Sequence, residues 1–301
     1  MTSRRSERGQ AMVLTLVFLS VLLAMSAAVI DVGAWYRAHR AVQATADASA
    51  LAAVTSLPES TSESSTLALD YAGRNGSGVT AGDVVFSTTN VTNDTVQVTA
   101  RRTVQGLFAS LFGLGSVTAR AHAKALSAVM GEARYAAPIG VDIKHPMLQC
   151  EPLPCFEQST QLDLQKTGPG AFRLINIDGS EGGTSPDILA DWMLNGYDGY
   201  MPLNWYFSDP GAKFNSSQIQ AALTARIGTE LLFPVYDDTR GGGANFEYKV
   251  VGWVGFHLTG FDARGNSGKL DGYFTRVVWE GIQGEGGTDD DFGVRTVALV
   301  E

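Results

Sequence analysis

The N-terminal part of the chain carries two successive hydrophobic patterns. Residues 11–30 form an uncharged run of twenty residues (30 − 10), most of them Val, Leu, Ile or Phe. A helix rises about 1.5 Å per residue, so this run would span about 30 Å, the thickness of a bilayer's hydrocarbon core. The pattern predicts a single transmembrane helix over residues 11–30, preceded by a short tail over residues 1–10.

The second pattern is one of small residues at helical spacing. Residues 31–57 are rich in Ala, contain no Pro and have Gly33 as their only Gly, which favours a continuing helix. Ala46 and Ala53 lie on a flat stripe of small side chains and are candidates for close helix packing. We expect one long helix, of which residues 31–57 form an extended Ala-rich part outside the bilayer.

Three residues mark the expected membrane boundary. Asp31 ends the apolar run, and Trp35 and Tyr36 follow at the depth where amphipathic rings prefer to lie. The lipid bilayer is therefore the first expected partner of the chain.

Other interpretations of the apolar run stay open. The basic residues before it could form the start of a cleaved signal peptide, with the small residues 24–26 at the cleavage site. The run could also be a buried helix of a soluble protein, or be processed after Gly9 in the manner of type IV prepilins. Those pilins usually carry Glu five residues after the cut, where this chain has Leu14.

From residue 58 the period of the pattern changes. A polar, Ser-rich stretch at 58–66 predicts a break, and a short helix is expected to follow it. Residues 95–101 and 117–125 alternate between two kinds of side chain, which predicts strands, and an apolar helical turn is expected at 107–112 between them. We expect a small α+β domain over 58–130, comparable by analogy to a pilin head behind its long helix.

A second domain is expected over residues 139–301. Residues 246–258 show an unbroken period-two apolar face, which predicts a long strand. Ser185 followed by Pro186 predicts one helix start, and Asn215 or Ser216 predicts another. The pattern favours a mostly antiparallel β domain with two helices on one face, and the fold class of the whole chain is α+β.

The chain has two cysteines, Cys150 and Cys155, which flank the sequence Glu-Pro-Leu-Pro. A zinc site needs more nitrogen or sulfur ligands, and no His/Cys partner pattern is visible. A disulfide would suit an oxidising, extracytoplasmic location. We predict the disulfide, with free thiols as the alternative and a metal site as the weakest.

Charge separates the two sides of the apolar run. The net charge is −9, and because residues 1–10 carry +2 the remainder carries −11. The positive-inside rule favours a cytoplasmic tail and an extracytoplasmic C-terminal region, although Arg37 and Arg40 beyond the run weaken that preference. The acidic remainder argues against nucleic acid as a partner.

Chemical motifs are largely missing from the sequence. It has no G-x-S-x-G elbow, no H-E-x-x-H and no phosphate-binding loop, and its histidines are scattered. Asp178 with Glu181, and the acidic run 289–291, could hold calcium, but polar turns explain them better. Aromatic side chains between 197 and 206 could bind sugar or a partner, but core packing explains them better. We expect no catalytic residue, no cofactor and no metal, and therefore no enzyme.

An ordered set of residues surrounds the apolar run: Arg8-Gly9-Gln10, Asp31-x-Gly33, Tyr36, Arg40, Gln43, Ala46-Asp47-Ala48 and Leu51-Ala52-Ala53. This set resembles the N-terminal segment of the TadE/TadG-like proteins of Flp (Tad) pilus assembly. The C-terminal half also looks like sequences attached to this segment in some members, around 177–180, 195–199 and 234–237. The D-x-S-x-S metal motif of larger members is not present.

The resemblance implies a membrane-anchored, non-enzymatic component of Flp-type pilus assembly, an accessory or minor pilin-like protein. Its partners would be other pilus-assembly or pilin-like membrane proteins, reached through the long helix. A single-pass location in the cell membrane, with the C-terminal region outside, is expected. The alternative is a membrane-anchored, extracytoplasmic binding module for a cell-wall polymer, a peptide or an ion.

Overall fold

The chain folds into two compact units, of which unit 1 comprises residues 1–126 and 298–301 and unit 2 comprises residues 127–297. The structure is a computed structural model. It describes residues 5–76, 78–113, 115–150, 154–164, 171–210, 213–264, 267–284 and 291–300.

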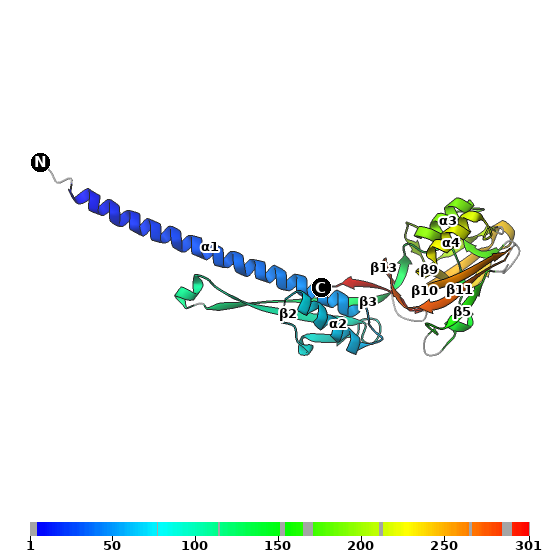
Figure 1. Cartoon of the computed structure of the whole chain (residues 1–301), viewed down its shortest axis with the longest axis horizontal. Coiled ribbons are helices and arrows are strands. Elements are labelled where there is room, and N and C mark those ends of the chain that lie inside the picture. Colours follow the sequence, from blue (N-terminus) through cyan, green and yellow to red (C-terminus); the bar gives the residue numbers. More distant parts are fainter. Residues whose placement is uncertain are drawn as a thin grey trace. The chain divides into compact units, whose positions relative to one another are not determined.

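One helix, α1 (Arg5–Val54), runs through the apolar run and the Ala-rich stretch without a break, as the pattern predicts (Figure 1). It is the only helix among the described residues that is long and apolar enough to cross a membrane, with a mean hydropathy of 2.7 over its best window. The hydroxyl of Thr15 donates to the carbonyl of Ala11 at 2.9 Å, and that of Ser20 to Val17 at 2.8 Å. These polar groups are thus satisfied inside the helix.

The Ala-rich half of α1 is one wall of the core of unit 1. Its buried apolar residues recur every three or four positions, which is the spacing of one helix face: Ala38, Val42, Ala46, Ala50 and Ala53, with Val54 beside the last of them. This face contacts α2 (Thr61–Arg74) and β2 (Thr95–Gln105). Because the side chains are small, the helix can approach the sheet closely.

The sheet of unit 1 is antiparallel and lies beside α1 (Figure 1). It pairs β1 (Val84–Ser87) with β2, and β2 with β3 (Ser116–Ala133), whose residues from Ser127 onward belong to unit 2. Its buried face consists of cross-strand pairs of small residues: Val96 with Ala125, Val98 with Ala123, and Ala100 with Ala121. The alternation predicted for both strands is confirmed.

Two local expectations in unit 1 were wrong in detail. The Ser-rich stretch is a break only as far as Ser60, which caps α2 by accepting from the amide of Glu63 at 3.1 Å, so that the helix begins at Thr61 within the stretch. The apolar turn is only a 3-10 helix, η2 (Ala109–Phe112), closed by Gly113 at φ 82°. A second 3-10 turn, η1 (Ala81–Asp83), leads into β1.

Unit 2 is built on a large, mostly antiparallel sheet. Its order is β4-β9-β10-β11-β5, with β6 and β8 joined at the side of β10 and a parallel contact only between β4 and β9. The strands of this sheet are β4 (Val141–Asp142), β5 (Ser159–Asp163), β6 (Ala171–Ile175), β8 (Trp205–Pro210), β9 (Glu230–Arg240), β10 (Glu247–Arg264) and β11 (Ser267–Thr275). The further short strands, β7 (Met201–Pro202), β12 (Val277–Val278), β13 (Gly281–Gln283) and β14 (Val294–Leu299), belong to the sheet of β1, β2 and β3 instead: β7, β13 and β14 pair with β3, and β12 pairs with β14.

Two helices, α3 (Pro186–Asn195) and α4 (Ser217–Arg226), contact each other beside this sheet (Figure 1). Ser185 and Ser216 cap them, as predicted. Aromatic rings fill the core, with Phe256 5.6 Å from Phe233 and 5.5 Å from Phe274 between ring centres.

Candidate functional site: the helix–hairpin contact

The carboxylate of Asp31 binds the turn between β2 and β3. Its side chain is buried, and its oxygens accept from the backbone amides of Leu107 at 2.8 Å, Phe108 at 3.0 Å and Ala109 at 2.6 Å. These amides open the 3-10 turn η2 and would otherwise have no partner in it. Hydrogen bonds to an ionised acceptor are stronger than neutral ones. Asp31 therefore holds the turn of the hairpin formed by β2 and β3 (the hairpin, below) against α1.

Two grooves flank this contact. The apolar groove, of about 250 Å³, is lined by Ala24, Ala27, Ala28, Asp31, Val32, Trp35, Phe108 and Ala109. The second groove, of about 410 Å³, lies further toward the C-terminal end of α1. It is lined by Trp35, Ala38 and His39 of α1 and by residues 104 and 117–120 of the hairpin. The apolar groove therefore reaches from the hairpin tip down into the predicted transmembrane run.

The two aromatic boundary candidates have different surroundings. Trp35 is partly buried and lines both grooves, so it packs between α1 and the hairpin. Tyr36 is 61 % exposed, and the guanidinium of Arg40 lies 6.0 Å from its ring centre. Their placement at a membrane boundary stays a prediction.

Gln43 makes a second polar contact between helix and hairpin. Its side-chain amide donates to Asp47 at 2.8 Å and to the backbone carbonyl of His122 on β3 at 3.2 Å. In the sequence, Gln43 and Asp47 stand out only as parts of the family pattern. Their spacing of four residues on a helix was the available signal that they could bond.

The two small-residue candidates lie inside unit 1. Ala46 and Ala53 each have 0 % exposed surface, because the chain's own elements cover this face of α1. They form a close-packing surface, and in the folded unit that surface is already occupied.

The hairpin's far end is held by a second buried carboxylate. Asp94 accepts from the amides of Thr89, Asn90 and Val91 at 2.8, 2.6 and 2.8 Å, and from the hydroxyl of Thr95 at 2.8 Å. Burial alone would raise the pKa of Asp94, but these hydrogen bonds outweigh it and hold the pKa below its ordinary value.

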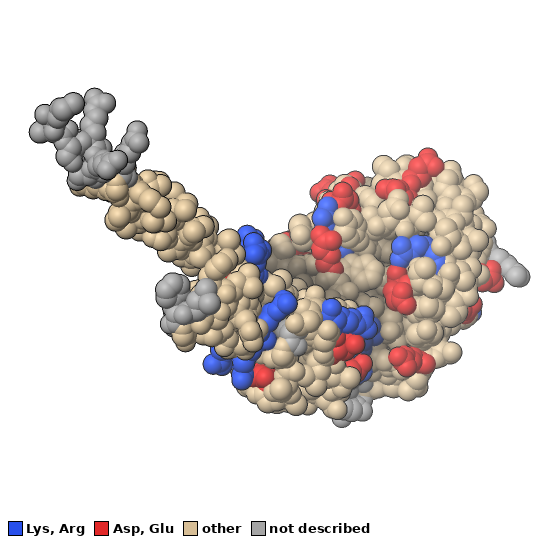
Figure 2. Space-filling view, turned by 60° about the vertical axis from the view of Figure 1, so that its left-hand side comes forward, with Lys and Arg blue, Asp and Glu red and all other residues tan. Residues whose placement is uncertain are grey.

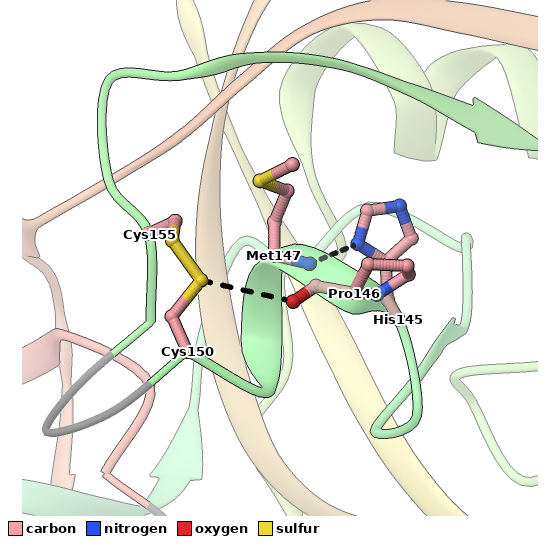
Figure 3. Close-up of a disulfide and its surroundings, with 5 residues drawn as sticks. All are labelled: His145, Pro146, Met147, Cys150 and Cys155. Atoms are coloured by element: carbon pink, nitrogen blue, oxygen red, sulfur yellow. Dashed lines mark hydrogen bonds between the residues drawn. A yellow bond between two sulfur atoms is a disulfide. The ribbon is translucent and has the colours of Figure 1, made fainter.

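The predicted disulfide between Cys150 and Cys155 is confirmed, with a Cα–Cα distance of 5.6 Å (Figure 3). The Sγ of Cys150 lies 3.8 Å from the carbonyl oxygen of Pro146, in the 3-10 turn η3 (Pro146–Leu148). His145 caps that turn by accepting the amide of Met147 at its Nδ1, at 3.2 Å. The bond thus joins two ends of a short segment in unit 2.

Candidate metal ligands do not gather in the part of the chain that the structure describes. It holds no group of three or more His, Cys, Asp or Glu side chains placed to bind an ion. Asp178 accepts from the amide and hydroxyl of Ser180, as in a polar turn. In the acidic run, residues 289 and 290 lie outside the described residues, and Asp291 pairs with Arg295.

Residues 9–56 match the model of Tad, the Flp pilus-assembly TadE/G-like family. The match covers α1 from Gly9 onward, including Asp31 and the buried Ala-rich face, which confirms the resemblance for this segment. No curated protein matches the chain, and no solved structure matches it either.

Proposed function

We propose that this protein is a membrane-anchored, non-enzymatic component of Flp-type pilus assembly, of the accessory or minor pilin-like kind. The observation that carries the proposal is the family match over residues 9–56. That segment coincides with the one helix, among the residues that the structure describes, that is long and apolar enough to cross a membrane. In this proposal α1 is both the anchor and the contact with other membrane proteins of the assembly.

The lipid-facing half of α1 is the better candidate for that contact. Residues 11–30 are exposed or nearly so in the isolated chain, whereas Ala46 and Ala53 are buried in unit 1. Helices in lipid associate by close packing of their exposed faces rather than by the hydrophobic effect. A partner helix would therefore meet α1 within the bilayer.

The experiment replaces residues 11–30 by an unrelated transmembrane sequence and leaves residues 31–301 unchanged. This boundary keeps the core of unit 1 intact, because its buried helix face begins at Asp31. We expect the chimera to insert and fold but to leave a strain lacking the native protein without surface pili. Wild-type protein expressed at the same level is the control.

Full restoration of pili by the chimera would contradict the proposed helix contact. The helix would then serve only as a tether, and function would reside in the units outside the membrane. The binding-module alternative would follow, and binding assays with cell-wall polymers and peptides would test it.

A further inference from the structure

The turn between β2 and β3 is held at the end of the apolar run. Asp31 is the first residue after the uncharged stretch, and it binds three consecutive amides of the turn. The turn therefore lies at the height on α1 where the predicted transmembrane part ends. It cannot stand far from the bilayer surface if residues 11–30 span the bilayer.

The turn presents apolar side chains at that height. Leu107 is 70 % exposed and Phe108 is 39 % exposed. Residues 103–119, which include the whole turn, carry no charged side chain. Exposed Leu and Phe side chains at the tip of a hairpin gain by leaving water for an apolar phase.

Arginines surround this uncharged stretch. Arg102 and Arg120 bracket it on the hairpin, and Arg37 and Arg40 are exposed on α1 about 9 and 14 Å above Asp31 along the helix axis. Residues 31–43 and 99–122 contain one acidic residue, the buried Asp31. Figure 2 shows basic side chains on unit 1 near the place where the uncharged part of α1 enters it.

The apolar groove extends the same surface below the turn. Its deepest residue, Ala24, lies about 10 Å below Asp31 along the helix axis, within the uncharged run. A lipid acyl chain is the apolar group available at that depth in a bilayer.

We propose that the β2–β3 turn is a second membrane contact of the protein. Leu107 and Phe108 enter the interfacial layer beside α1, an acyl chain occupies the apolar groove, and Arg37, about 9 Å above Asp31 along the helix axis, extends its side chain back toward the lipid phosphates. The inference rests on the membrane anchoring of α1 proposed above. With two contacts, the rotation of α1 in the bilayer is fixed.

The test uses the full chain in vesicles of phosphatidylethanolamine and phosphatidylglycerol. Single cysteines at Leu107, Phe18 and Val85 carry a nitroxide label, since the native cysteines form a disulfide and are not free. Collisions of each label with oxygen and with a polar nickel complex report its depth. All three side chains are exposed in the structure, so labelling should leave the fold intact.

We expect the oxygen-to-nickel collision ratio at Leu107 to exceed that at Val85 by roughly tenfold, because polar complexes are excluded from apolar surroundings. The label at Phe18 should lie deeper still. A ratio at Leu107 equal to that at Val85 overturns the proposal while leaving the anchor in place. Shielding of Leu107 from both reagents also overturns it, and assigns the turn to a protein partner. A water-exposed label at Phe18 would overturn the anchor and this proposal together.

Discussion

A carboxylate directly after an uncharged run has to be stabilised if it is buried. Three backbone amides of the turn stabilise the carboxylate of Asp31 by donating hydrogen bonds to it. The same bonds give these amides the acceptors that they lack within the turn. From sequence, Asp31 could be placed at the membrane boundary, but its partners could not, because they lie more than seventy residues away.

Replacing Asp31→Asn tests this contact. The amide keeps the size of the side chain but removes the charge and one acceptor oxygen, which leaves a buried amide of the turn without a partner. We expect a loss of about 1–3 kcal/mol in the stability of the turn. Hydrogen exchange at the amides of residues 107–109 measures it.

The matched control is Asp70→Asn, since Asp70 is 46 % exposed and forms a surface ion pair with Arg74. Such pairs contribute about 0–1 kcal/mol. Unchanged protection of the turn amides in Asp31→Asn would show that the carboxylate does not hold the hairpin.

Asp94 gives the hairpin's other end a dependence on pH. Its pKa is lower in the folded chain than in the unfolded chain, where Asp has a pKa of about 3.9. The stabilisation is therefore fully present above about pH 4 and is lost as pH falls through the folded pKa. We expect the amides of residues 89–91 to lose hydrogen-exchange protection in this acid range.

The variant Asp94→Asn isolates that effect. It should weaken protection at neutral pH and should flatten the pH dependence that the wild-type turn shows below pH 4. Equal slopes for the two proteins would assign the acid sensitivity to other carboxylates.

At the scale of elements, hydrophobic periods and capping residues predicted local secondary structure, but not which elements pack against each other. The alternation in β3 and β10 and the caps of α3 and α4 were correct, because each depends on neighbours along the chain. The start of α2 was missed, since Ser-rich sequence disfavours helix and only its cap and packing overcome this. A small-residue stripe indicates a packing face, but it does not say that the hairpin of the same chain covers it.

The buried face of α1 makes a prediction that distinguishes two neighbouring alanines. Ala46→Leu adds a bulky side chain to a position with 0 % exposure and should cost about 1–3 kcal/mol in unit 1. Ala44→Leu makes the same change on the exposed face of the helix and should be nearly neutral. Denaturant titration of both variants in detergent compares them.

Equal stabilities for Ala44→Leu and Ala46→Leu would mean that the hairpin does not dock on this face. A defect in pilus assembly from Ala44→Leu, with normal stability, would instead locate a partner on the outer face of the helix.

At the scale of the whole molecule, charge and redox chemistry favour one orientation in the membrane. Residues 1–10, before the apolar run, carry +2, and the confirmed disulfide suits an oxidising compartment. We predict that residues 1–10 are cytoplasmic and that residues from Asp31 onward are extracytoplasmic. A reporter active only outside the cytoplasm should work when fused after Glu301 and fail when fused before Met1.

The reverse pattern of reporter activity would contradict this orientation. A mature N-terminus close to Ala27 would show that the apolar run is a cleaved signal peptide, and α1 would then lose its membrane part.

The chain leaves unit 1 at Leu126 and returns to it at Ala298, where the amide of Val300 donates to the carbonyl of Lys124 at 2.9 Å. Unit 2 is thus inserted between two neighbouring strand segments of unit 1. In evolutionary terms an inserted unit can be exchanged for another, because the contacts inside unit 1 do not depend on the sequence of unit 2. Selection could therefore diversify unit 2 while α1 stays unaltered, which agrees with a family match confined to residues 9–56.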